Sequence, residues 1–208
     1  MSTKETHLAA APSPLPRRMD PRGLVRTALV FYGVLLGLAW LWRSGIRGQS
    51  LWRAVPDAPI HWIRDPLLGA ATAAAMIALS AAATRHTEVG RALARALGAA
   101  LGPLRVRECI VLAALSGVAE EAVFRGALQP EVGLVVASVL FGAAHFAPRR
   151  ELRVWTVFTL AAGFLLGALY DATGNLVAPV VAHFGINAVN LHKLSREYGG
   201  AESLNAER

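Results

Sequence analysis

The chain has 208 residues, of which 54% are hydrophobic and only 17% are charged, and its mean hydropathy is positive. This composition is typical of integral membrane proteins and argues against a set of water-soluble domains. The formal net charge of +7 does not indicate nucleic-acid binding, because the arginines flank apolar runs and no polar domain presents them to a duplex. The single cysteine, Cys109, excludes an internal disulfide framework.

The N-terminal half combines a basic tail with two predicted membrane spans. Residues 1–23 are rich in proline and basic residues, and we expect them to be disordered. The apolar runs 24–42 and 66–84 are each long enough to cross a bilayer. Segment 43–65 between them is rich in arginine and tryptophan, which suits the level of the lipid headgroups. Residues 88–102 place arginines and leucines on different faces, which predicts an amphipathic surface helix or a short loop helix.

Four further apolar runs follow in the C-terminal half, at 109–128, 132–147, 154–170 and 176–191. Pro130 is predicted to end the first of them. The sequence therefore predicts an all-α fold, a polytopic bundle of about six transmembrane helices. Its predicted parts are a tail (1–23), a two-span N-terminal region with interfacial segments (24–107), a core (108–191) and a cytoplasmic C-terminal tail (192–208).

The basic residues predict the orientation of the bundle in the membrane. With a cytoplasmic N-terminus and one crossing per run, the cytoplasmic segments hold sixteen lysines and arginines, against four on the other side. This distribution obeys the positive-inside rule. Both termini are therefore predicted to be cytoplasmic.

Glu120, Glu121 and Arg125 interrupt the apolar run 109–128. A charged side chain at the centre of a bilayer costs roughly 2.5–3.5 kcal/mol on insertion scales, so these residues need partners and indicate a functional site. Helix geometry places Glu121 and Arg125 on one face, whereas Glu120 points about 100° away. A salt-bridged patch between packed helices is the alternative interpretation. We favour an active centre in which Glu120 is the general base and the Glu121–Arg125 pair supports it.

Three other polar residues, His145, His183 and Asn187, fall inside the predicted spans. The spacing of four residues places His183 and Asn187 on one helix face. The predicted topology allows both of them, with His145 and Glu120, to converge on one cavity in the cytoplasmic half. A lone histidine on an apolar face is more often a packed core residue, so this hypothesis depends on the carboxylates. The remaining histidines lie in tails or loops and are given no role.

Three motifs cover these residues: EEAVFRG at 120–126, FGAAH at 141–145 and HFGIN at 183–187. In this order they resemble the E-E-x-x-x-R, F-x-x-x-H and H-x-x-x-N motifs of the CPBP family of intramembrane peptidases, also called the type II CAAX prenyl endopeptidase or ABI family. TGNLVAP at 173–179 is similar to the family's T-G-S-L-x-x-P. Each motif alone is weak, but all three at this order and spacing are specific. The resemblance covers about residues 108–190.

The resemblance implies an all-helical intramembrane endopeptidase. Glu120 and His145 would activate a water molecule, and His183 and Asn187 would stabilise the oxyanion, each such donor contributing about 3–4 kcal/mol. Glu121, Arg125 and Phe141 would be supporting residues.

The implied partners are the lipid bilayer and a protein or peptide with a membrane-associated terminus. This terminus could be a prenylated C-terminus, a secreted leader peptide or a C-terminal membrane anchor, the last as in myxosortase-like members. The alanine- and arginine-rich, lysine-poor composition favours a bacterial protein-processing enzyme of the inner membrane.

Three alternatives remain beside this interpretation. Two histidines and two acids could ligate zinc, but the H-E-x-x-H spacing is absent, and we favour a mechanism without metal or cofactor. A transporter with an intramembrane proton relay would also place acids and histidines in membrane helices, although no internal repeat is evident. The third is a family member without catalysis, acting as a scaffold or bacteriocin-immunity protein, which the intact motifs argue against.

Overall fold

The computed structural model describes residues 20–147, apart from 56 and 58, and residues 152–200. The N-terminal tail that was predicted to be disordered therefore lies almost entirely outside the described residues. Residues 201–208 also lie outside them. Within the described residues the regular secondary structure is helical, and strand-like pairing is limited to one isolated bridge between Arg53 and Asn175. This confirms the predicted all-α class.

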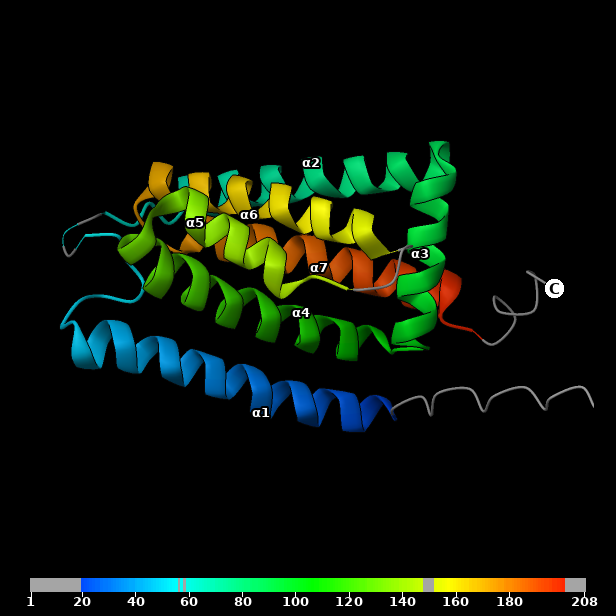
Figure 1. Ribbon diagram of the computed structural model, residues 1–208, viewed down its shortest axis with the longest axis horizontal. Coiled ribbons are helices and arrows are strands. Elements are labelled where there is room, and N and C mark those ends of the chain that lie inside the picture. The colour runs from blue at the N-terminus through cyan, green and yellow to red at the C-terminus, as the bar shows by residue number, and fades with distance from the viewer. Residues whose placement is uncertain (1–19, 56, 58, 148–151, 201–208) are drawn as a thin grey trace, which may run out of the picture.

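In the described part of the chain, six long helices run side by side along the bundle (Figure 1): α1 (Pro21–Trp40), α2 (Arg64–His86), α4 (Val106–Glu121), α5 (Gln129–Ala144), α6 (Arg153–Thr173) and α7 (Val177–Tyr198). Helix α3 (Glu88–Leu101) crosses one end of the bundle, where α1 begins and α7 ends. Two π-helical segments, η1 (Leu41–Ile46) and η2 (Ala122–Leu128), extend α1 and α4. Because α7 continues to Tyr198, helix reaches into the segment predicted as the C-terminal tail.

The chain reverses direction within the helical stretch that contains α4 and α5. Gly133 has φ 81° and ψ 166°, which breaks the helix at a conformation that glycine adopts readily. Pro130 occupies the first turn of α5, where its missing N–H is tolerated, so it does not end the stretch as predicted. A straight helix would separate residues 120 and 145 by roughly 37 Å at 1.5 Å per residue. Their side chains instead approach within 3.5 Å.

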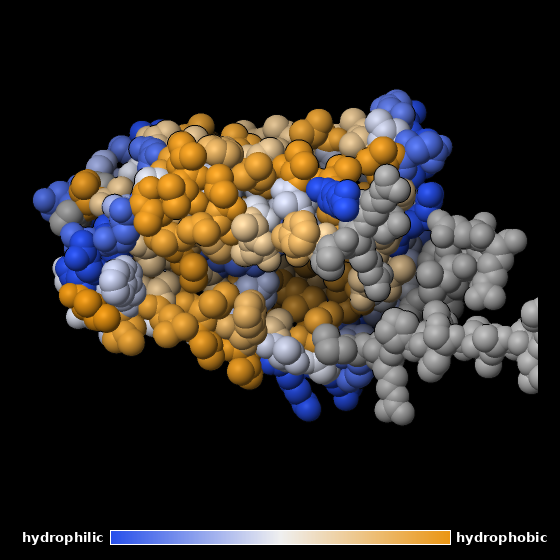
Figure 2. All heavy atoms as spheres, in the orientation of Figure 1, coloured by the Kyte–Doolittle hydropathy of each residue, from blue (hydrophilic) through white to orange (hydrophobic). Residues whose placement is uncertain are grey.

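Within the described residues, four helical stretches are long and apolar enough to cross a membrane: Pro21–Ile46, Arg64–His86, Val106–Ala144 and Arg153–Thr173. The predicted number of about six spans is therefore not confirmed by length and composition. One of these stretches contains both α4 and α5, and α7 is not among them. Figure 2 shows apolar side chains over the middle of the bundle and polar ones toward its ends, as expected of an integral membrane protein.

Glycines allow close contacts between the helices that carry the predicted site. A Cβ atom at Gly117 of α4 would lie 3.1 Å from the backbone nitrogen of Phe184 on α7. At Gly163 of α6, it would lie 3.1 Å from the carbonyl oxygen of Ser138 on α5. Small residues at such crossings let helix backbones approach closely inside a membrane. The two contacts hold α4 against α7 and α5 against α6.

Candidate active site

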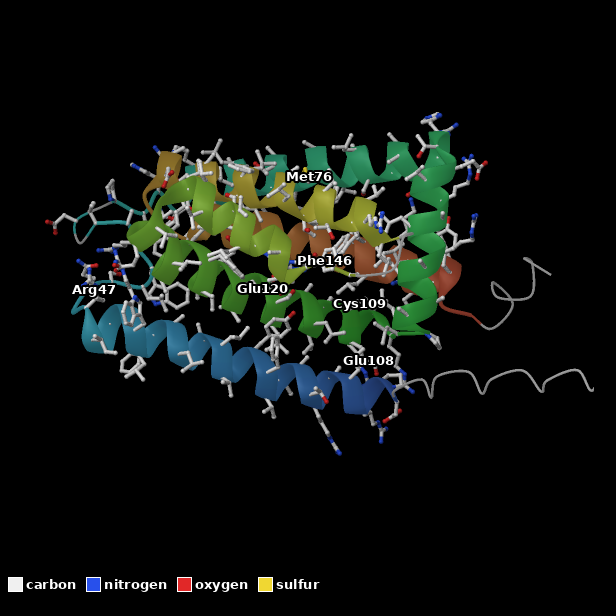
Figure 3. The ribbon with its side chains drawn as sticks, in the orientation of Figure 1. Arg47, Met76, Glu108, Cys109, Glu120 and Phe146 are labelled. Carbon is white, nitrogen blue, oxygen red and sulfur yellow. The ribbon has the colours of Figure 1, made fainter. Side chains whose placement is uncertain are left out.

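The polar residues predicted from the sequence lie on four neighbouring elements of the bundle. Glu120 and Glu121 end α4, Arg125 lies in η2, and Phe141 and His145 belong to the last turn of α5 and its cap. His183 and Asn187 lie on α7. Figure 3 shows Glu120 on α4, well inside the bundle and away from both of its ends.

Glu121 and Arg125 form the ion pair that their spacing predicts. Arg125 Nη1 donates to Glu121 Oε1 at 3.0 Å, and the two side chains are 1% and 0% exposed. The guanidinium also donates from Nη2 to the carbonyl oxygen of Gly163 at 2.9 Å and lies 4.5 Å from the centre of the Phe141 ring. Charge, hydrogen bonding and the ring face together offset the desolvation of Arg125.

Glu121 has a second partner that the sequence did not indicate. His183 Nδ1 lies 2.7 Å from the same Oε1 atom of Glu121. An ionised carboxylate only accepts hydrogen bonds, so the Nδ1 atom carries the proton. Glu121 therefore links Arg125 of η2 to His183 of α7 and fixes the orientation of the imidazole ring.

Glu120 faces both histidines with one oxygen. Its Oε2 atom lies 3.5 Å from His145 Nε2 and 3.9 Å from His183 Nε2. Its Oε1 atom accepts a hydrogen bond from the hydroxyl of Tyr32 on α1 at 2.9 Å. The Glu120 residue is 8% exposed. The structure therefore brings together three of the four residues that were predicted to be catalytic.

The backbone orients His145. Its Nδ1 atom lies 2.8 Å from the carbonyl oxygen of Phe141, and because a carbonyl only accepts, Nδ1 donates. In the neutral ring this leaves Nε2 as an acceptor directed toward Glu120. The ring also lies against Phe141 and Trp155, with centroid distances of 4.6 and 6.1 Å.

Asn187, the fourth predicted residue, has a different neighbour. Its Nδ2 atom donates to the hydroxyl of Ser116 on α4 at 2.9 Å. Asn187 nevertheless lines the same cavity as His145 and His183, a space of about 380 Å³ enclosed mainly by α2, α3, α6 and α7. The walls are largely apolar, and Glu120 lies behind the histidines and not in the wall.

Three residues near the site were missed by the sequence analysis: Tyr32, Ser116 and Trp155. Ser116 precedes Glu120 by one helical turn, so spacing alone could have placed it on the same face of α4. Tyr32 is a polar residue in an apolar helix, which is a signal for a buried partner. Trp155 carries no such signal, because tryptophan is common near the ends of membrane helices.

The arrangement of possible metal ligands bears on the zinc alternative. Within the described ranges, no group of three or more His, Cys, Asp or Glu side chains is placed to hold a metal ion. The Nδ1 atoms of both site histidines are already engaged by oxygen acceptors.

The fold and this site define a helical membrane protein with a buried glutamate and histidine cluster beside an apolar cavity. Residues 102–189 match the family model described as type II CAAX prenyl endopeptidase Rce1-like. This segment contains every site residue predicted from the sequence. The match confirms the resemblance that the three motifs indicate, over residues 102–189.

Over 82 residues the chain is 49% identical to a protein of Bacillus subtilis (strain 168) described as "Uncharacterized protein YpbD". The matched part covers 38% of this chain and 42% of that relative, which is less than half of either protein. No solved structure matches the chain significantly.

Proposed function

We propose that the protein is an intramembrane endopeptidase that hydrolyses a peptide bond of a membrane-associated protein or peptide, using water activated by Glu120 and His145. The observation that carries this proposal is the placement of Glu120 Oε2 within 3.5 and 3.9 Å of two histidine Nε2 atoms. A carboxylate inside a membrane-spanning bundle is energetically unfavourable unless it has partners, and such a group usually serves a function. The Rce1-like match of residues 102–189 supports the same class of enzyme.

The nucleophile would be a water molecule held between Glu120 and His145. With Nδ1 of His145 donating to the backbone, its Nε2 atom and Glu120 Oε2 are both acceptors. A water molecule can donate one hydrogen to each, which directs a lone pair away from both and toward a carbonyl carbon in the cavity. Glu120 takes the proton as the water attacks, and this proton then passes to the leaving amine.

His183 and Asn187 would stabilise the negative oxygen of the tetrahedral intermediate. They lie one turn apart on α7, and both line the cavity. The Asn187 amide has two N–H groups, one of which donates to Ser116, so the other can donate to the substrate. His183 would donate from Nε2 in its imidazolium form, with Glu121 as the counter-ion. Donors that point at developing charge in a dry site contribute strongly to catalysis.

The walls of the cavity favour an apolar substrate segment that enters from the bilayer. We therefore infer that the substrate is a protein or peptide with a membrane-associated terminus, such as a leader peptide or a C-terminal anchor. The alanine- and arginine-rich composition supports a bacterial inner membrane as the location, and the charge asymmetry supports cytoplasmic termini. The beginning of α1 and the end of α7 lie at the same end of the bundle, as this topology requires (Figure 1).

A comparison of membrane-protein termini tests the proposed activity. We expect at least one shortened or newly exposed terminus in cells that contain the wild-type protein, and none in cells that lack it. Complementation with His145→Gln should fail, because a glutamine side chain lacks the ring that the Phe141 carbonyl oxygen orients and so does not reproduce the fixed Nε2 acceptor that holds the water. His86→Gln is the matched control, because His86 is exposed at the end of α2 and should restore processing. Identical termini in all four strains would overturn the proposal.

A separate prediction concerns metal dependence. We expect cleavage to survive strong chelators, and the purified protein to carry no stoichiometric zinc, because the ligand spacing matches no zinc pattern. Elemental analysis and a chelator titration measure this. One zinc per chain, lost together with activity in His145→Ala, would replace the proposed mechanism with a metalloprotease one.

A further inference from the structure

Helix α1 lies outside the Rce1-like segment, yet it reaches the site with one polar side chain. The hydroxyl of Tyr32 donates to Glu120 Oε1 at 2.9 Å. The buried residues of α1 are Ala28 and Ala39, which stand four residues before and seven residues after Tyr32. This spacing places all three on one face, and α1 packs with this face against α4 and η2, with Ala39 in a cluster that includes Ala122 and Ala127 of η2. The rest of this helix exposes large apolar side chains, including Phe31 beside Tyr32.

We infer that Tyr32 is a positioning residue that fixes which oxygen of Glu120 accepts the proton, so that α1 completes the active centre. This inference rests on the proposed function. Tyr32 touches no reacting atom in it and acts only through Glu120.

The two carboxylate oxygens of Glu120 have different surroundings. Oε1 receives the phenol hydrogen, whereas Oε2 faces the Nε2 atoms of His145 and His183 and has no hydrogen-bond partner within the described residues. The terminal torsion of a glutamate is broad and nearly two-fold, so the carboxylate plane is poorly defined without a donor. The Tyr32 hydroxyl fixes this plane and leaves Oε2 as the oxygen that holds the water.

A purely structural role for Tyr32 would be to attach α1 to α4. Tyr170 offers a matched control for this alternative, because it is also a tyrosine in the bundle and is 2% exposed. Its hydroxyl is buried without a hydrogen-bond partner in the described part of the chain. Tyr→Phe removes the same atom at both positions, but only Tyr32→Phe removes a donor from Glu120.

Infrared spectroscopy of the purified full-length protein tests the inference without any substrate. The carboxylate band of Glu120 is identified by its loss in Glu120→Gln. We expect this band to shift in Tyr32→Phe, because a carboxylate that loses a charge-assisted hydrogen bond changes its C–O stretching frequency. The band should stay in place in Tyr170→Phe. An unshifted band in Tyr32→Phe would overturn the inference.

Kinetics with a substrate found by the terminus comparison then tests the consequence for turnover. Tyr32→Phe should lower kcat roughly tenfold to hundredfold and leave KM unchanged, because a hydrogen bond to a charged group is lost at the base and not at the binding surface. Tyr170→Phe should keep the wild-type kcat. A shifted band with a wild-type kcat would overturn the positioning role. The infrared result does not depend on cleavage, so failure of the proposed function is distinguishable from failure of this inference.

Discussion

Glu121→Gln should destabilise the folded protein by roughly 3–5 kcal/mol, the usual cost of removing one partner from a buried ion pair. Arg125 is 1% exposed, and Glu121 is its carboxylate partner at 3.0 Å. Glutamine keeps the shape of the side chain but leaves the guanidinium charge uncompensated. The same substitution weakens the hydrogen bond to His183 Nδ1, so the α4–α7 contact is affected as well.

Thermal or denaturant unfolding of the purified protein measures this effect, with Glu88→Gln as the control. Glu88 pairs with Arg91 three residues later on α3, but its side chain is 81% exposed. Exposed pairs contribute little to stability, so Glu88→Gln should leave the unfolding midpoint almost unchanged. Equal and small shifts in the two variants would contradict the buried role of Glu121.

The parts of this structure that follow from local geometry could be predicted from the sequence. The helices follow from apolar runs of sufficient length, and the Glu121–Arg125 pair follows from the rise and turn of a helix. Local geometry did not predict where the chain turns. Proline is the stronger helix breaker in general, yet Pro130 is accommodated in a first turn and Gly133 makes the reversal through its positive φ.

The contacts between helices were less predictable, because they depend on how each helix is rotated about its axis. The approach of His145 to Glu120 was expected from the three motifs and the topology. The contact of His183 with Glu121 was not, since Glu121 already had a partner four residues away. Asn187 was expected to face the substrate only, and its hydrogen bond to Ser116 depends on the close α4–α7 crossing at Gly117.

Neither the motifs nor the helical periodicity predicted the role of α1. The resemblance begins near residue 108, so it assigns nothing to the first helix. A tyrosine near the middle of an apolar helix indicates a buried partner but does not identify it. The partner depends on how α1 is rotated about its axis, which the packing of its Ala28 and Ala39 face against α4 and η2 determines.

Glu120→Gln should abolish turnover and leave the protein folded. Glutamine can still accept the Tyr32 hydrogen bond through its carbonyl oxygen, so the packing of α1 on α4 is kept. An amide cannot take a proton from water, and loss of a general base lowers rates by roughly 10²–10⁴-fold. The loss should fall on kcat with KM little changed, because Glu120 lies behind the wall of the cavity and not in it.

Peptide cleavage and thermal melting of Glu120→Gln and Glu121→Gln, measured side by side, separate the roles of the two acids. Glu120→Gln should melt like the wild type and be inactive, whereas Glu121→Gln should melt at a lower temperature. If Glu120→Gln cleaves normally while Glu121→Gln is folded, stable and inactive, then Glu121 is the base. In that case His183, which contacts Glu121 at 2.7 Å, would be the histidine that activates water together with the base, and not His145.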